Sequence, residues 1–175
     1  LAEAPGAIPD MARNLVRRAA HLVGIRERTG RTIALALEPE PCCFLETIDE
    51  TVGFFEQHLF GATAVHQLCE LTGLARGDAE DALRRHLGVC YDVCHAAVEF
   101  EDPAGSLRAL RAAGIGVPKL QLSAALRIGA VGPETAPQLR PFDEPVYLHQ
   151  VIARQDGRLT RYLDLPQALE ALAQN

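Results

Sequence analysis

The chain has 175 residues, of which 48% are hydrophobic and 23% are charged. These values are typical of one globular domain and exclude a disordered chain. No apolar run approaches the ~20 residues of a membrane span. The formal net charge of −6 disfavours a nucleic-acid backbone or an anionic membrane as the main partner. The chain begins at Leu1 rather than at a methionine, so we expect it to be a piece of a longer protein.

The first half of the chain alternates helix and strand. Asp10 is a good N-cap for an amphipathic helix over residues 10–29. The apolar run 32–37, which lies between a glycine and a proline, predicts a strand buried on both faces. Thr47 and Glu50 form a capping box that opens a helix to about Phe60.

The alternation continues through the middle of the chain. The patterns predict helices at 62–74 and 78–86, a strand at 88–93, a helix from Asp102 and a strand at 117–123.

The last third is rich in turn signals. Residues 130–145 are rich in proline and glycine and predict a loop with one helical turn. A strand is expected at 146–152, and Asp156-Gly157 is a hairpin signal after which 159–163 would pair back antiparallel. A final helix starts at Leu165.

Strands that alternate with helices indicate a parallel sheet with right-handed crossovers. Asp92, Gln121 and His149 are 29 and 28 residues apart, close to the ~31 residues per unit of an eight-unit barrel. We therefore predict a partial TIM barrel with four parallel strands, with residues 1–175 as one domain. The alternative is a small doubly wound sheet, which the lack of a glycine-rich phosphate loop disfavours.

Half a barrel would leave two open sheet edges, and such edges invite pairing with other chains. We therefore expect the chain to form part of a longer ordered protein or to associate with a second copy of itself.

Polar residues stand at the expected C-terminal strand ends: Glu38, Asp92, His95, Gln121 and His149. In a barrel these ends converge at the active-site mouth. Carboxylate, imidazole and amide ligands suit a divalent ion such as Mn²⁺, Mg²⁺, Fe²⁺ or Zn²⁺. Each residue also has a purely structural interpretation: as a polar residue where a strand ends, as a helix cap, or as a hydrogen-bonded histidine in the core.

Two residues are candidates for moving a proton during catalysis. Glu40 follows the first strand, and Lys119, the only lysine, shares a strand face with Gln121 and Ser123. Lys119 could instead pair with a nearby carboxylate.

The five cysteines, an odd number, do not indicate a disulfide framework. Residues 1–9 also lack the features of a signal peptide, so we expect a cytoplasmic protein with reduced thiols. A thiolate zinc site from Cys42, Cys43, Cys94 and His95 is an alternative to the carboxylate site, although no CxxC pair supports it.

Three segments, at 37–41, 88–96 and 119–123, resemble the xylose-isomerase-like TIM barrels. Residues 91–96 are similar to the D-T-C-H-A signature of the endonuclease IV type in that superfamily. The chain most resembles the metabolite-traffic proteins of the EboE type, which it also matches at 147–150 and 161–165. The likeness extends from about residue 10 to residue 170.

The resemblance implies roles for the polar residues. Glu38 would match the metal-bridging glutamate, and Asp92 and His95 would match the paired ligands of the D-x-x-H motif. Gln121 stands where many relatives have histidine, and His149 lies where a later strand supplies another histidine. These departures favour a single metal or a degenerate site over a three-metal nuclease cluster.

Two functions follow as hypotheses. The first is a metal-dependent enzyme with isomerase or epimerase chemistry on a polyol or carbonyl metabolite. The second is a non-catalytic protein that binds or traffics a small-molecule metabolite on the same barrel. An apurinic-site nuclease is disfavoured by the negative charge.

Overall fold

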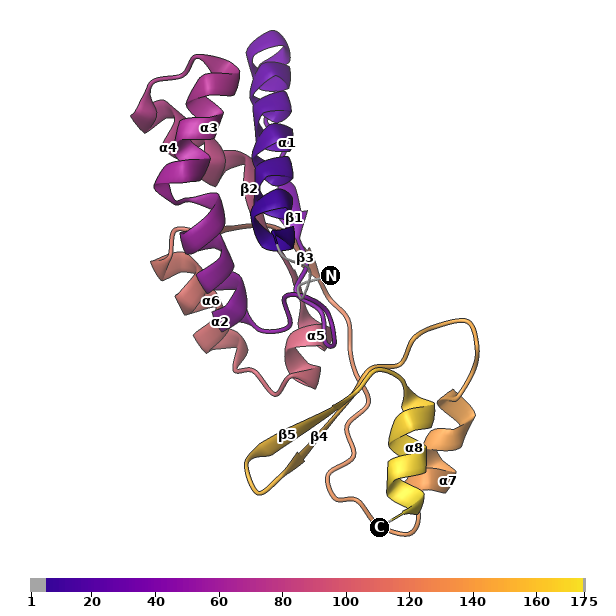
Figure 1. Cartoon of the computed structure of the whole chain (residues 1–175). Helices are drawn as coiled ribbons and strands as arrows, with labels where there is room; N and C mark the ends of the chain where they lie inside the picture. Colours follow the sequence, from indigo (N-terminus) through magenta and orange to yellow (C-terminus); the bar gives the residue numbers. More distant parts are fainter. Residues whose placement is uncertain (1–5, 175) are drawn as a thin grey trace.

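The structure, a computed structural model, describes residues 6–174. Its first part alternates helices and strands (Figure 1): α1 (Ala7–Thr29), β1 (Leu35–Leu37), α2 (Ile48–Phe54) with a π-helical turn (Phe55–Leu59), α3 (Ala62–Thr72), α4 (Arg76–His86), β2 (Leu87–Asp92), α5 (Val93–Val98), α6 (Pro103–Ala112) and β3 (Gly116–Gln121). Its second part contains α7 (Thr135–Leu139), a 3₁₀ turn (Arg140–Phe142), β4 (Val151–Gln155), β5 (Arg158–Tyr162) and α8 (Leu165–Ala173).

The first three strands form one parallel sheet in the order β1-β2-β3. In its register Leu35 is opposite Leu87, and Asp92 is opposite Gln121. The central strand β2 is buried along its whole length, as its apolar sequence predicts, whereas most of β3 is exposed. The parallel pairing of these three strands is confirmed.

The predicted partial barrel with four parallel strands is wrong. The three-stranded sheet has β1 and β3 as its edges, and the other sheet of the described residues is the antiparallel pair β4-β5. The expected fourth strand at 146–152 does not join the parallel sheet. Its apolar residues Val146, Tyr147 and Leu148 are 74%, 73% and 52% exposed.

Local contacts explain this outcome. The Glu144 carboxylate accepts hydrogen bonds from the backbone N–H groups of Val146 and Tyr147, which turns the chain before a strand begins. Asp156 and Gly157 both have positive φ, at 51° and 80°, as a tight hairpin turn requires. This turn pairs β4 with its immediate neighbour β5, which costs less chain entropy than pairing with a distant strand. The hairpin prediction is confirmed.

The sequence predicted some of the helix starts accurately and others wrongly. Thr47 and Glu50 form the full capping box of α2, and Asp102 caps α6. In contrast, α1 begins after Gly6, so Asp10 is not its N-cap, and α4 begins at Arg76 rather than at the predicted residue 78.

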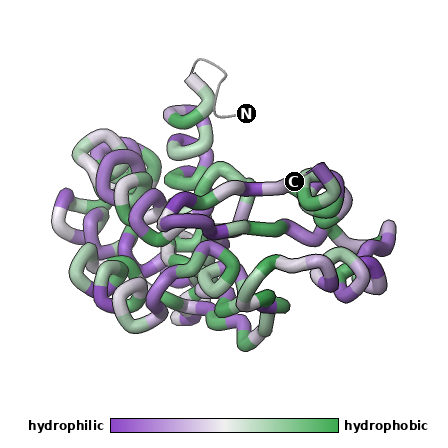
Figure 2. The backbone as a smooth tube through the Cα atoms, turned by 90° about the horizontal axis from the view of Figure 1, so that it is seen from below, coloured by the Kyte–Doolittle hydropathy of each residue, from purple (hydrophilic) through white to green (hydrophobic). Residues whose placement is uncertain are grey.

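The hydrophobic core belongs to the first part of the chain. Its buried members run from Ala12 to Ile115 and come from the helices around the sheet and from β2. In α1 the buried residues Ala12, Val16, Ala19 and Val23 recur every three or four positions, as an amphipathic helix over a core requires. Figure 2 shows hydrophobic and hydrophilic residues mixed along the backbone. The hairpin, α7 and α8 are set apart from this core (Figure 1). None of the helices described is long and apolar enough to cross a membrane.

Candidate functional site

Polar side chains gather where the three parallel strands end. Glu38 follows β1 directly, Asp92 is the last residue of β2, and Gln121 is the last residue of β3. Because the strands are parallel and adjacent, their carboxyl ends lie at the same edge of the sheet. The chain then enters α5 immediately after Asp92, which brings Cys94 and His95 to the same edge.

The Gln121 amide joins the two carboxylates. Its Nε2 lies 2.7 Å from Glu38 Oε1 and 2.6 Å from Asp92 Oδ2. Since both partners are acceptors, only the NH₂ group of the amide fits between them. Two carboxylates at close range repel each other, and the two N–H donors offset that repulsion without a cation.

Asp92 is the most strongly held member of this group. Its Oδ1 accepts hydrogen bonds from the Ser123 hydroxyl and from the backbone N–H of Cys94, at 2.9 Å, and the residue is only 8% exposed. Burial would raise the pKa of Asp92, but the bonds from Ser123 and Cys94, together with the nearby His95, outweigh it and lower the pKa to about 2. Asp92 is therefore a carboxylate at neutral pH.

His95 faces the loop that follows β1. Its Nδ1 lies 3.1 Å from the carbonyl oxygen of Pro39 and 3.5 Å from Glu38 Oε1. In the neutral ring an Nδ1–H that donates to this carbonyl leaves the Nε2 lone pair free. A backbone carbonyl that fixes the tautomer in this way is the usual support of a metal-binding histidine.

Cys94 completes a set of metal-ligating groups. One ligand atom from each of Asp92, Cys94 and His95 lies within 4.8 Å of the other two. Ligand atoms around a tetrahedral Zn²⁺ are about 3.5 Å apart, so the site would have to contract by about an ångström to hold an ion. Burial and the neighbouring Asp92 raise the pKa of the Cys94 thiol, although the Ser123 hydroxyl opposes this. The thiol is therefore neutral at neutral pH and would release its proton to solvent on binding a metal.

The structure thus brings together Glu38, Asp92, His95 and Gln121 of the predicted metal ligands. It places the fifth, His149, in another environment, with its Nε2 3.7 Å from Glu144 and its Nδ1 3.8 Å from Asp164.

The two predicted catalytic residues lie in different places. Lys119 is exposed on the edge strand β3, opposite Cys90. The Glu40 carboxylate accepts a hydrogen bond of 2.6 Å from the side-chain amide of Gln150, so it holds the segment before β4. This contact supports a structural role for Glu40.

Sequence reasoning missed two partners in the site. Ser123 was noted only for sharing a face with Lys119, and it proves to be a donor to Asp92. Cys94 was considered with Cys42 and Cys43 rather than with Asp92. The D-x-C-H order was the available signal, because a short helix that starts at the aspartate turns positions 94 and 95 towards the same edge.

The five cysteines are all free thiols. Burial raises the pKa of both Cys42 and Cys43, and nearby glutamates raise it further, so neither thiol is activated. The thiolate zinc site that would include Cys42 and Cys43 is not among the metal-ligating groups found in the described residues.

Comparisons of the chain with protein-family models, with curated proteins and with solved structures found no match in any of the three. The resemblance to the xylose-isomerase-like superfamily stays a prediction from the sequence segments that carry it.

Proposed function

We propose that this chain is a metal-dependent enzyme that holds one divalent ion at the carboxyl end of its parallel sheet and acts on a small oxygen-bearing metabolite. The observation that carries the proposal is the convergence of Asp92, Cys94 and His95 within 4.8 Å. Three protein ligands with a fourth position left for water or substrate is the pattern of catalytic zinc sites.

The donor types favour Zn²⁺ within the divalent ions considered. Mg²⁺ and Mn²⁺ prefer oxygen ligands, whereas a thiolate and an imidazole are characteristic of Zn²⁺. Asp92 Oδ2 accepts the bond from Gln121 and retains a second lone pair for an ion. His95 offers Nε2, since Nδ1 is directed at the Pro39 carbonyl.

Glu38 supplies the base in this proposal. Its side chain is 32% exposed and lies beside His95, so a substrate at the metal can reach it. The ion would polarise a carbonyl or hydroxyl oxygen of the substrate, and Glu38 would take the proton that this polarisation acidifies.

A second candidate function is metabolite binding without a metal. The bridging Gln121 amide favours it, because the amide already offsets the repulsion between Glu38 and Asp92 that would otherwise call for a cation. In this alternative the same polar edge of the sheet hydrogen-bonds a metabolite directly.

Metal titration distinguishes the two candidates. Calorimetry with Zn²⁺ and Mn²⁺ on the metal-free protein is expected to show one tight Zn²⁺ site per chain. Co²⁺ substitution is expected to give a sulfur-to-cobalt charge-transfer band, which Cys94→Ser abolishes. His95→Ala is expected to lose most of the Zn²⁺ affinity.

His66→Ala is the matched control, because His66 is an exposed α3 residue paired with Glu70. The melting temperature of each variant with chelator must equal that of the wild type. Unchanged affinity in His95→Ala refutes the metal site, and a wild type that binds no divalent ion favours metal-free metabolite binding.

A further inference from the structure

Two separate segments carry the proposed base Glu38 and the proposed ligand His95. Glu38 opens the β1–α2 loop, residues 38–47, and His95 lies in α5. They meet where the His95 ring approaches the Pro39 carbonyl at 3.1 Å. The geometry of the site therefore depends on how firmly this loop is held against α5.

A glutamate lies at or near the C-terminal end of each segment, and both glutamate carboxylates approach the same side chain of the hairpin. Glu46 lies near the end of the β1–α2 loop, and Glu99 follows the last residue of α5. The side chain of Glu46 is 17% exposed and that of Glu99 is fully buried. Burial raises the pKa of Glu99, which the hydrogen bond from Arg161 counteracts. A shared cation offsets the repulsion between two such carboxylates.

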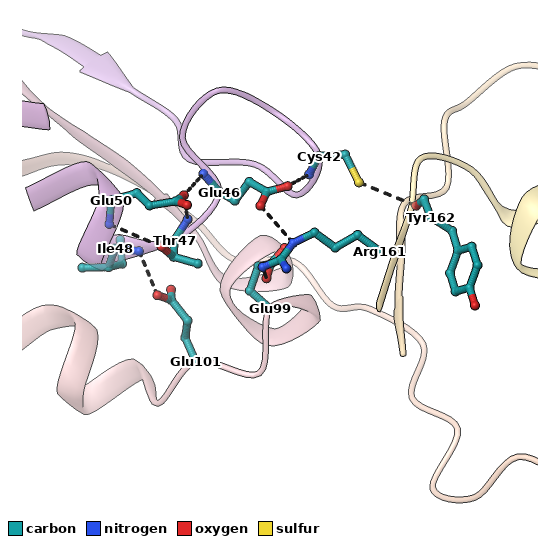
Figure 3. A network of polar contacts seen from close by, with 9 residues as sticks. All are labelled: Cys42, Glu46, Thr47, Ile48, Glu50, Glu99, Glu101, Arg161 and Tyr162. Carbon is teal, nitrogen blue, oxygen red and sulfur yellow. Dashed lines mark hydrogen bonds and ion pairs between the residues drawn. The ribbon is translucent and has the colours of Figure 1, made fainter. Parts of the chain in front are cut away.

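Arg161, from strand β5 of the hairpin, is that cation (Figure 3). Its Nε lies 2.9 Å from Glu46 Oε2, and its Nη2 lies 2.7 Å from Glu99 Oε2. The planar guanidinium fork can hold two carboxylates at once in fixed directions, which a lysine ammonium does less well. We call this three-residue contact the Arg161 clamp.

The Arg161 clamp acts on a loop that Glu46 itself organises. Glu46 Oε1 accepts the backbone N–H of Cys42 at 2.7 Å, and the backbone N–H of Glu46 donates to Glu50 at 2.9 Å. Cys42 has a φ of 63°, a left-handed conformation that is unfavourable for a residue with a side chain, so it needs such support. The Cys42 thiol also reaches the Tyr162 carbonyl of the hairpin, at 3.6 Å (Figure 3).

We propose that Arg161 is a positioning residue for the metal site: it ties the β1–α2 loop to the end of α5 and so keeps His95 in ligating geometry, with Glu38, the proposed base, beside it. The inference rests on the proposed function, and it assigns to the C-terminal hairpin a role in the chemistry of the sheet edge. Arg161 touches no ligand atom and acts through Glu46 and Glu99. Losing a partner bonded directly to a metal ligand costs about ten- to a hundred-fold in metal affinity, and Arg161 acts further out, so we expect an effect at the lower end of this range.

The test compares Arg161→Gln with Arg158→Gln, in the 175-residue chain. Arg158 is an exposed arginine on the same strand and is the matched control. Hydrogen exchange of the metal-free proteins measures the protection of residues 38–47. Competition with a chelator measures Zn²⁺ affinity, and the Co²⁺ spectrum reports the ligand geometry.

The expected result for Arg161→Gln is faster exchange in residues 38–47, Zn²⁺ affinity lower by about ten-fold, and an altered Co²⁺ spectrum with one ion still bound. Arg161→Lys is expected to restore part of the affinity, and Arg158→Gln to behave as the wild type. If Arg161→Gln does not fold, Glu46→Gln tests the same clamp from the loop side.

Two results overturn the proposal. One is unchanged exchange in residues 38–47, which shows that Arg161 does not hold the loop. The other is faster exchange with unchanged Zn²⁺ affinity and spectrum, which shows that holding the loop does not serve the metal. A wild type that binds no metal refutes the proposed function instead, and the exchange data then support or refute the clamp independently.

Discussion

The two parts of this chain are held in place by different forces. Residues 7–121 contain the whole hydrophobic core cluster, with β2 buried along its length. Residues 122–174 bury few apolar side chains, chiefly Ile152 and Leu165. This second part is joined to the first by polar contacts from Gln150 and Arg161 and by stacking of Arg154 on Phe100.

The difference shows how one chain can combine a rigid scaffold with an adjustable support. Apolar burial is non-directional and large, so the first part is stable over a wide range of conditions. The ion pair of Arg161 with Glu46 is partly exposed, and such pairs contribute little and weaken with salt, whereas the Glu99 carboxylate is buried. The hairpin is therefore expected to respond to solution conditions before the core does, although its Arg161 reaches the two segments that carry Glu38 and His95.

The largest expected effect tests whether apolar burial stabilises the first part of the chain. Phe55 is fully buried and packs edge-on against Phe60, with ring centroids 5.3 Å apart. We expect Phe55→Ala to lower the free energy of unfolding by about 3–5 kcal/mol, because it leaves a cavity in the core. Phe142→Ala, at a position 44% exposed in the second part, is the matched control and should cost less than about 1 kcal/mol. Urea unfolding measures both, and equal losses would contradict the division into two parts.

The second prediction concerns acid stability at the sheet edge. Hydrogen bonds lower the pKa of Asp92 from 3.8 to about 2 despite its burial. A lowered folded-state pKa means that Asp92 stabilises the fold above about pH 4, and that this contribution, about 2 kcal/mol, disappears as the pH falls to about 2.

Urea unfolding at several pH values checks the acid-stability prediction. Between pH 4 and pH 2 the wild type should lose about 2 kcal/mol more than Asp92→Asn does. Asp81→Asn, at an exposed position of α4, is the control and should follow the wild type. If Asp92→Asn and the wild type lose the same unfolding free energy between pH 4 and pH 2, the Asp92 carboxylate does not accept the hydrogen bonds from Ser123 and Cys94.

The third prediction concerns the amide between the two carboxylates. Gln121→His replaces the bridging NH₂ group with a neutral nitrogen that can ligate an ion. We expect Zn²⁺ affinity to rise by about ten-fold, roughly 1.4 kcal/mol. Gln138→His, at an exposed position in α7, adds the same side chain in the second part and should leave the affinity unchanged. Weaker binding in Gln121→His, measured by calorimetry, would show that the amide does not stand at the metal position.

The sequence predicted the first part well for physical reasons. The apolar run that became β2 is buried in the sheet along its whole length, and the Thr47–Glu50 and Asp102 caps are local signals that need no tertiary information. The meeting of Glu38, Asp92 and Gln121 followed from the parallel strand order alone.

The second part was harder to predict from the sequence, because residues 146–152 could either join the parallel sheet or leave the pairing to a local hairpin. The pattern at 146–152 fits a strand, but the Glu144 contacts and the Asp156-Gly157 turn favour local pairing over a place in the sheet. Once the hairpin formed, His149 could not reach the predicted cluster through a fourth strand. The Arg161 clamp joins residues over 60 positions apart, and no periodicity in the sequence indicates such a contact.

The smallest expected effect lies at the contact between the two parts. The Arg154 guanidinium lies 4.2 Å from the centroid of the Phe100 ring, just beyond α5. A two-stranded hairpin is marginally stable by itself, so protection of the β4–β5 amides depends on such docking contacts. We expect Arg154→Met to lower the opening free energy of these amides by about 0.5–1 kcal/mol and to leave the β2 amides unchanged. Native-state hydrogen exchange measures both sets of amides in one experiment. Arg154→Lys keeps a cation over the ring and should lose less than Arg154→Met, so equal losses in the two variants would show that the ring contact does not hold the hairpin.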